Sequence, residues 1–478
     1  MSDQKEVGFV QRVNKFIAYL DGLPGVKISD IVESDNGAIG WVTALFKDEI
    51  EVLLLNDKDV RPKDIFYQTG RHLTIPLGNF LLGRVINPLG ATIDEGRPLF
   101  TKDQASEVFY PETLDSLAPS LGERHFIDRQ LDTGITLIDT LMPLGRGQRE
   151  LVIGDPRSGK AGFVLDLLAN LKDTGTVCVY GIIGKSLPAL RSIIQAIASR
   201  GVLPYTVVVA AASVDPAPLI FLTPQTVFTI AEFFQKQGKD VIVVLNDMGV
   251  HAKIYREISL IAKRAPGRDS YPGDIFYQHA HLMERGGNFL NGSSITVLPE
   301  IELDLNDFST YIPTNLMGMT DGHLLFKSAL LAQGYNPAID TTLSVTRVGR
   351  QTQNRVQELL STLIRQTLAR ASQLETLSQF SFELPPETQA LFKQATQIRE
   401  LLKQPSGAFI SKEVQTVLLA LPFTHYLTEK DLDYVEKNKT EIMDKFAKHP
   451  ITKEVFSFND EQELIKKLDE TYGHDQAN

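Results

Sequence analysis

The feature that most constrains this chain of 478 residues is a glycine-bounded loop that ends in lysine, Gly-Asp-Pro-Arg-Ser-Gly-Lys at residues 154–160. An apolar run of strand length, residues 150–153, precedes the loop. After the loop, helical spacing brings four apolar side chains onto one face: Phe163, Val164, Leu167 and Leu168. A strand, a glycine-rich loop with lysine and a helix in this order predict a phosphate-binding loop.

The chemistry of such a loop resides mostly in its backbone. Glycines let successive N–H groups turn inward around phosphate oxygens, and the helix N-terminus adds a partial positive charge. We expect Lys160 to reach the outer phosphates, and an ordinary glycine-rich turn is the less favoured alternative. The candidate ligand-binding residues of the loop are Gly154, Asp155, Pro156, Arg157, Ser158, Gly159, Lys160 and Ala161.

The oxygen ligands that normally hold magnesium beside such a loop are missing. Ala161 stands where a hydroxyl would coordinate the metal. The apolar run 241–245 ends in Asn246, which has no charge, and Asp247 comes one residue late, which in a strand means the opposite face. Another strand-like run ends at Lys185, where no carboxylate can orient a water molecule. We therefore expect phosphate binding without a metal ligand, and we expect the chain by itself to be catalytically inactive.

Three regions follow one another along the chain. Residues 1–75 contain short strands separated by turns, which favours a small antiparallel barrel over an open sheet. Residues 76–352 alternate apolar strand-length runs with helix-sized segments, as in a parallel sheet buried on both faces. Residues 353–478 show a helical period. The proline-rich stretches 111–119 and 216–224 predict loops.

The individual strands can be predicted from the same patterns. In the first region we expect strand runs at residues 8–19, 38–44, 50–55 and 65–68. In the second we expect them at 150–153, 176–183, 206–211, 241–245 and 294–298. In the third, one helical stripe joins Val356, Leu359, Leu360, Leu363, Ile364 and Leu368.

Composition excludes several other classes of protein. Lys plus Arg number 48 against 59 Asp plus Glu, a net charge of −11, so the basic footprint of a nucleic-acid-binding protein is absent. A single cysteine, Cys178, excludes an intrachain disulfide and a multi-cysteine metal site, and we expect it in the core. The nine histidines form no ligand-spaced cluster, so no metal site is expected; His279 and His281 could bind a metal in principle, but a polar stretch beside the sheet is the preferred interpretation. No uncharged apolar stretch has the ~18 residues of a membrane span. Any contact with a membrane is therefore expected through partners.

Nine segments, in this order and spacing, closely resemble the alpha subunits of F-type ATP synthases over nearly the whole chain. They are residues 81–90, 132–139, 143–150, 266–268, 271–277, 311–315, 320–322, 343–349 and 400–404. The resemblance implies a six-stranded N-terminal β-barrel, a central RecA-like domain with a mainly parallel sheet and a C-terminal helical bundle. It implies ATP or ADP as the ligand, with Gln404 in the segment on the adenine side.

The resemblance also implies an assembly. Alpha chains alternate with beta chains in a hexamer around a rotating gamma-type stalk, as a peripheral complex on the cytoplasmic face of the cell membrane. The resemblance begins at the barrel, which argues against the usual contact with the delta or stator subunit.

The chain departs from that family where metal and catalysis are concerned. Lys185 occupies the position of a glutamine in alpha chains and of the catalytic glutamate in beta chains. Asn246-Asp247 replaces a pair of aspartates, and Asn336 replaces an arginine. Four loop members differ as well: Pro156, Arg157, Ser158 and Ala161. These departures favour a nucleotide bound without tightly held magnesium.

The resemblance also implies a catalytic role for one arginine. Arg347 follows an apolar run that predicts a strand, at whose end a side chain can project beyond its own domain. In the family the matching arginine reaches the neighbouring beta site and stabilises transition-state charge, which makes Arg347 a catalytic candidate in trans. An interface salt bridge is the alternative, and for Arg256 and Arg268 a structural or interface role is the preferred one.

Two functions compete at this stage. The first is a non-catalytic alpha subunit of an ion-driven ATP synthase, which binds nucleotide and supplies Arg347 to a beta subunit. The second is an alpha-like scaffold subunit of an F1-like ATPase motor that is not coupled to ATP synthesis. A hexameric RNA-translocating helicase is disfavoured by the negative charge and by the missing hydrolytic carboxylate.

Overall fold

The computed structural model describes residues 6–94, 98–101, 108–111, 113–114, 116–303, 307–378 and 385–472. These residues belong to two compact units. The first unit comprises Met1–Phe126, Gly147–Ile153 and Lys172–Asp321, and the second comprises Ile127–Arg146, Gly154–Leu171 and Gly322–Asn478. The phosphate loop and its helix therefore belong to the second unit, although the strand that leads into the loop belongs mostly to the first.

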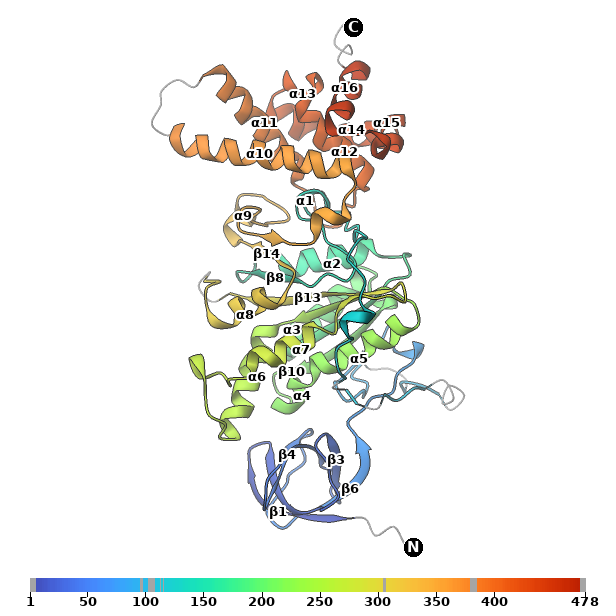
Figure 1. Ribbon diagram of the computed structural model, residues 1–478, viewed down its shortest axis with the longest axis vertical. Coiled ribbons are helices and arrows are strands. Elements are labelled where there is room, and N and C mark those ends of the chain that lie inside the picture. Colours follow the sequence, from blue (N-terminus) through green and yellow to red (C-terminus); the bar gives the residue numbers. More distant parts are fainter. Residues whose placement is uncertain are drawn as a thin grey trace. The chain divides into compact units, whose positions relative to one another are not determined.

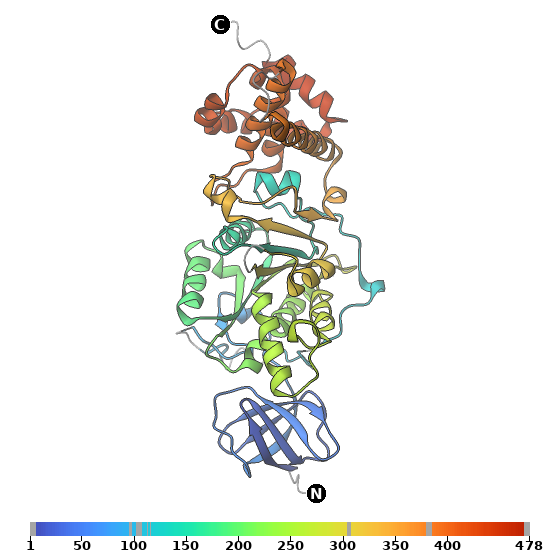
Figure 2. The same cartoon turned by 90° about the vertical axis from the view of Figure 1, so that its left-hand side faces the viewer.

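The first unit begins with a closed antiparallel barrel (Figure 2, blue), which confirms the predicted fold of this region. Side chains that point inward from alternate strand positions, such as Leu20, Val32, Val42 and Phe66, form its core. The strands follow the order β1-β2-β5-β4-β3-β6 around the barrel. Their bounds are Val7–Asn14 (β1), Ile17–Gly22 (β2), Asp30–Ser34 (β3), Ile39–Leu45 (β4), Ile50–Leu54 (β5) and Ile65–His72 (β6).

One strand prediction in the barrel was wrong. The run at residues 8–19, expected to be one strand, contains parts of two, because the chain reverses between Asn14 and Ile17. Lys15 adopts a left-handed conformation there, with φ 54°. The imperfect alternation of the run therefore reflects a hairpin.

A mostly parallel sheet follows in the first unit, as predicted. Its strands run in the order β8-β13-β11-β9-β10-β7, and the short β12 pairs antiparallel with β13. Strands β9, β10 and β11 are buried almost throughout, which explains their continuous apolar sequence. The bounds are Val85–Ile86 (β7), Glu150–Gly154 (β8), Val177–Lys185 (β9), Thr206–Ala212 (β10), Val241–Asn246 (β11), Gly287–Asn288 (β12) and Ser294–Glu302 (β13).

Helices connect these strands (Figure 1, green to yellow). They are α3 (Leu187–Ser199), α4 (Ala217–Phe221), α5 (Thr223–Lys236), α6 (Met248–Ile261), α7 (Ile275–Met283) and α8 (Tyr311–Met319). Single 3-10 turns in this unit are η1 (Asn79–Leu81), η3 (Leu121–Glu123), η4 (Leu203–Tyr205) and η5 (Arg268–Ser270).

The loop predicted at residues 216–224 is helical instead, since α4 ends and α5 begins inside it. Pro218 and Pro224 each lie in the first turn of a helix, where the missing N–H has no intrahelical acceptor and the fixed φ suits the helix. Of the described residues, Ala217–Lys236 is the one helical stretch long and apolar enough to cross a membrane. Its most apolar window is 89% buried in the protein, as in a core helix.

The second unit contains the predicted helical region, which is confirmed (Figure 1, orange to red). Val356, Leu360 and Ile364 of the expected stripe are fully buried in it. The helical region contains α10 (Arg355–Ser378), α11 (Pro386–Leu402), α12 (Lys412–Ala420), α13 (His425–Thr428), α14 (Leu432–Ala447), α15 (Pro450–Glu454) and α16 (Glu461–Tyr472). The second unit also contains α1 (Thr136–Leu141), α2 (Lys160–Asn170) and α9 (Ser328–Ala332), which precede that region. Shorter elements are the antiparallel pair β14 (Gly322–Phe326) and β15 (Val345–Thr346), and the turns η6 (Gly349–Thr352), η7 (Leu421–Phe423) and η8 (Val455–Ser457).

Two histidines form a buried pair in the first unit, between α6 and α7. His251 Nδ1 lies 3.1 Å from His279 Nε2, and His251 Nε2 donates to the carbonyl oxygen of Phe221 at 3.1 Å. Both rings are fully buried, and burial lowers the pKa of His251 to about 4 and the pKa of His279 well below its usual value. The folded protein therefore holds both rings neutral.

This pair predicts a loss of stability in mild acid. Between pH 6.5 and about 4 the unfolded chain binds protons that the folded state refuses, so the free energy of unfolding falls as the pH falls. We expect His251 to contribute a loss of about 2 kcal/mol between pH 7 and pH 5. Urea titrations at both pH values should show a smaller loss for His251→Gln. In the control His125→Gln, which changes an exposed histidine, the free energy of unfolding should fall by as much as in the parent. Equal pH dependence in both variants would contradict the prediction.

Candidate functional site

The predicted phosphate loop lies between strand and helix as expected. Strand β8 ends at Gly154, and helix α2 begins at Lys160. Gly159 precedes the helix in the left-handed region, with φ 95°, a conformation that glycine adopts without steric cost. Pro156 and Arg157 are exposed at the tip of the loop. The arrangement leaves the first backbone N–H groups of α2 available in the way that phosphate binding requires.

Strand β14 and helix α9 support the loop from within the second unit. A Cβ on Gly154 would lie 2.2 Å from the carbonyl oxygen of Phe326, so only glycine fits this position. The Asp155 carboxylate is buried and accepts hydrogen bonds from the backbone N–H and the hydroxyl of Ser328, both at 2.9 Å. Asp155 therefore fixes the start of the loop.

Lys160 is buried and folded back onto its own loop. Its Nζ donates to the carbonyl oxygens of Gly154 at 2.7 Å and Asp155 at 2.5 Å, and lies 3.4 Å from the Ser158 hydroxyl. The loop thus holds its own cation among backbone oxygens. A bound phosphate has to compete with these carbonyls for the ammonium group.

The first unit contains the strand-end residues Asn246, Asp247 and Lys185. Strand β11 ends at Asn246, whose Nδ2 donates to Glu300 Oε2 at 3.0 Å. Asp247 caps helix α6, because its Oδ1 accepts from the N–H groups of Gly249 and Val250 at 2.7 and 3.1 Å. Its Oδ2 lies 3.4 Å from Lys185 Nζ in an ion pair.

Asp247 was expected on the opposite face of a strand, and this prediction was wrong. The strand has already ended, and this residue is a helix cap with extended backbone angles. Its carboxylate is engaged on both oxygens. Among the described residues, no group of three or more His, Cys, Asp or Glu side chains could hold a metal ion.

Sequence reasoning missed a buried carboxylate, Glu300. Strand β13 was expected to end at residue 298 but continues to Glu302, so Glu300 lies inside the sheet and is 3% exposed. The Tyr180 hydroxyl lies 3.4 Å from Glu300 Oε1. Burial, with Glu300 as the next cause, raises the pKa of Tyr180 well above its usual value. The strand continues through a proline, Pro299.

Gln404 is buried within the second unit, and its side-chain amide is fully used by the protein. Its Oε1 accepts from the backbone N–H and the hydroxyl of Thr136 at 2.9 and 2.8 Å. Its Nε2 donates to the carbonyl oxygens of Gly134, at 2.7 Å, and Ala408. An amide has two donors and two acceptor lone pairs, so this one has no capacity left for a ligand. The contact of Gln404 with an adenine stays a prediction.

Arg347 directly follows β15 and is exposed. It lies close enough to His323 for its charge to contribute, after burial, to the lowered pKa of that histidine. The predicted position at the end of a strand is correct. The role of Arg347 at a partner's site stays a prediction.

Together, the barrel, the phosphate-loop domain with its parallel sheet and the helical region define a multidomain α/β protein of the nucleotide-binding class. Residues 134–346 match the family described as ATP synthase alpha/beta family, nucleotide-binding domain. Residues 353–472 match the C-terminal domain of the ATP synthase alpha/beta chain. The chain belongs to the ATP synthase alpha/beta family. The matched nucleotide-binding domain supports ATP or ADP as the ligand.

Relatives cover most of the chain. The ATP synthase subunit alpha of Macrococcus caseolyticus is 38% identical over 425 residues, which are 88% of this chain and 83% of that protein. The subunit alpha of Lactobacillus delbrueckii subsp. bulgaricus is 36% identical over 448 residues, 93% of this chain and 88% of the relative. That of Caldanaerobacter subterraneus subsp. tengcongensis is 34% identical over 472 residues, 98% and 92% of the two chains. The resemblance to alpha subunits is confirmed.

Proposed function

We propose that this chain is a non-catalytic, alpha-type subunit of an F1 hexamer. It alternates with beta-type subunits around a gamma-type stalk, on the cytoplasmic face of the cell membrane, and reaches the membrane through its partners. Its own site binds ATP or ADP without tightly held magnesium. Arg347 serves the catalytic site of a neighbouring beta-type subunit.

The state of Asp247 is the observation that carries this proposal. One of its oxygens caps α6, and the other pairs with Lys185. Asn246 donates its amide to Glu300 rather than presenting a carboxylate. Ala161, on the first turn of α2, has no side-chain oxygen at all. The residues present do not fit a tightly bound magnesium ion.

Phosphate binding depends on the loop itself. The backbone N–H groups at the start of α2 would donate to phosphate oxygens, and Lys160 would exchange its carbonyl acceptors for the phosphate. The exposed guanidinium of Arg157 at the tip of the loop can cover part of the charge that magnesium normally neutralises. These contacts hold a nucleotide without activating a water molecule.

Exposed apolar side chains support the proposal that a partner subunit contacts this chain. In the first unit, Leu117, Leu121 and Phe126 are 86%, 87% and 83% exposed, although all three are large hydrophobic residues within ten positions of one another. A contact with another protein would remove these side chains from water, which favours association. An alternating hexamer requires such surfaces on each subunit.

The test of the proposal is a nucleotide titration with and without magnesium. We expect the affinity of the full chain for ATP to differ less than threefold between excess magnesium and excess chelator, because no described group offers a metal site. Isothermal titration calorimetry measures both values. A magnesium-dependent gain above about tenfold, roughly 1.4 kcal/mol, would contradict the prediction, as would the absence of binding under both conditions.

A double variant is the matched control. Ala161→Thr with Asn246→Asp restores the hydroxyl and the carboxylate of the family pattern, so it should gain affinity for ATP only when magnesium is present. A control variant with the same shapes but no new charge, Ala161→Val with Asn246→Leu, should not gain. Equal behaviour of the two double variants would show that these positions do not face the metal.

The second candidate, an alpha-like scaffold of an F1-like motor that is not coupled to ATP synthesis, is favoured by the same Asp247–Lys185 pair, since a scaffold needs no metal. Co-purification separates the two functions. A tagged chain that brings down ion-translocating membrane subunits with its beta-type partner supports the synthase. A tagged chain that brings down a beta-type partner without them supports the separate motor.

A further inference from the structure

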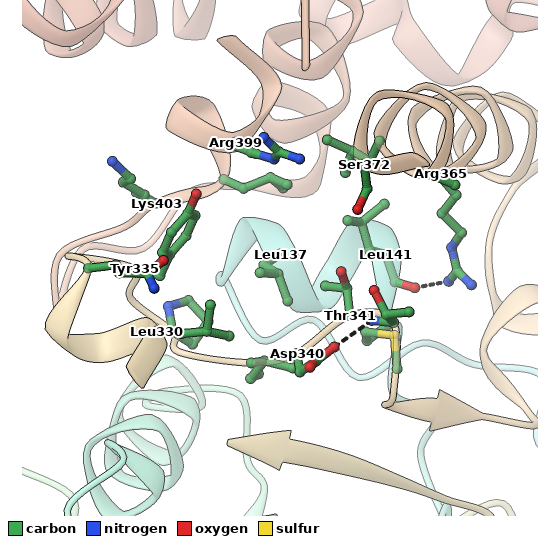
Figure 3. A pocket seen from close by; sticks show the side chains of 18 of the residues that line it. Leu137, Leu141, Leu330, Tyr335, Asp340, Thr341, Arg365, Ser372, Arg399 and Lys403 are labelled. Carbon is green, nitrogen blue, oxygen red and sulfur yellow. Dashed lines mark hydrogen bonds between the residues drawn. The ribbon is translucent and has the colours of Figure 1, made fainter. Parts of the chain in front are cut away.

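A pocket of about 810 Å³ lies within the second unit, outside the phosphate loop. Helices α1, α10 and α11 and the segment 330–342 line it (Figure 3). None of the residues 154–161, Gln404 and Arg347 belongs to its lining, but Asn336 and two residues of the segment expected on the adenine side, Leu402 and Lys403, do. Its volume is that of sites which bind small organic ligands. It therefore has the size of a second ligand site beside the proposed nucleotide site.

The floor of the pocket is apolar. Leu137, Leu141 and Met142 from α1 and its C-terminal end are at most 6% exposed and line it, together with Ile339 and Leu402. Figure 3 shows Leu137 and Leu141 below the two longer helices. A ligand that places an apolar body here removes its surface from water, which supplies affinity without directional contacts.

Positively charged side chains lie at the rim of the pocket. Arg399 extends over the pocket from α11, and Lys403 lies near the ring of Tyr335, with its Nζ 5.4 Å from the ring centroid (Figure 3). Arg399 pairs with Glu375 at 2.7 Å, in a bridge whose side chains are 27% and 45% exposed. Such exposed pairs contribute little stability, and Glu375 engages two of the five N–H donors of the guanidinium. Arg399 can therefore accommodate a second carboxylate or sulfonate.

The charge balance limits what the rim can hold. Three cationic side chains line the pocket, Arg365, Arg399 and Lys403, against the two acidic ones, Asp340 and Glu375. Two of these are paired outside the lining, Lys403 with Glu400 and Asp340 with Lys327, each at 2.7 Å, which leaves the excess of one positive charge unchanged. A ligand with several negative charges, such as a triphosphate, would meet the two carboxylates. A single negative charge matches the one positive charge in excess.

We propose that this pocket binds a small amphipathic monoanion. Its apolar body rests on the α1 floor, and its carboxylate or sulfonate lies at Arg399. Size, apolar floor and charge balance all point to this one class of ligand, and the geometry separates the pocket from the phosphate loop.

The probe for the test is 8-anilinonaphthalene-1-sulfonate, an aromatic body with one sulfonate. Isothermal titration calorimetry with the full chain should show one saturable site. Ala369 lies exposed on α10 and lines the pocket, so Ala369→Phe fills the mouth without disturbing the core, and we expect at least a tenfold loss of affinity. Gln366→Phe, on the same helix but outside the lining, is the matched control and should bind like the parent.

A second comparison tests the role of charge. The neutral analogue N-phenyl-1-naphthylamine should bind about tenfold more weakly than the sulfonate, and Arg399→Gln should abolish that difference. Absence of a saturable site in the parent chain would overturn the proposal. So would an equal loss in Ala369→Phe and Gln366→Phe, or an equal affinity of the parent for the charged and the neutral probe.

Discussion

We expect a hexamer that carries Arg347→Ala to assemble normally with its beta-type partner and to lose ATPase turnover by a factor of roughly 10³ or more, since an arginine supplied by a neighbour contributes about 10³–10⁵ in related phosphoryl transfer. Arg347 is exposed and directly follows β15. Its charge is needed in the transition state, so the loss should appear in kcat more than in KM.

A neighbouring arginine is the control. Arg355 is also exposed, lies at the start of α10 and pairs with Glu358 at 3.4 Å. We expect Arg355→Ala to retain turnover within about threefold, because exposed pairs of this type contribute little. A loss below tenfold for Arg347→Ala, or failure of that variant to assemble, would assign Arg347 a structural role. Arg347→Lys should recover part of the turnover, because it retains the charge without the planar fork.

The second large effect is expected from Gly154→Ala. The new Cβ would lie 2.2 Å from the oxygen and 2.9 Å from the carbon of the Phe326 carbonyl group, and backbone atoms cannot rotate away as a side chain can. We expect the free energy of unfolding to fall by ~3 kcal/mol or more, a loss at the upper end of what single substitutions cause. Urea denaturation followed by circular dichroism measures it.

Two glycines in the same segment separate steric from conformational costs. A Cβ added at Gly159 would have no other atom within 4 Å, but the residue has a φ of 95°, so Gly159→Ala should cost about 1–2 kcal/mol for the left-handed conformation alone. Gly162 lies within α2 with open space around it, so Gly162→Ala should stabilise the protein by up to about 1 kcal/mol. Similar losses for all three variants would show that the contact with Phe326 is not decisive.

Local sequence predicted much of the fold. The phosphate loop, the buried parallel strands and the α10 stripe follow from spacing alone, because side-chain periodicity and glycine position are properties of neighbouring residues. Predictions failed where one local signal is compatible with two different structures. Proline at residues 218 and 224 suggested a loop but stands in the first turn of two helices. The apolar run expected to end at residue 298 belongs to a strand that continues through Pro299 to Glu302.

The candidate site also has features that the sequence determines and features that only the tertiary structure determines. The side chain of Ala161 has no oxygen, and that of Asn246 has no charge, in any fold that the chain could adopt, so the loss of the usual metal ligands is determined by the sequence by itself. The contacts of Asp247 were decided by the tertiary structure. Strand β11 ends one residue before Asp247, and Lys185 of β9 lies beside its carboxylate. The pairing of Asn246 with Glu300 likewise requires β11 and β13 to lie side by side. Strand neighbours and strand ends depend on the packing of the whole sheet, and no window of adjacent residues contains that information.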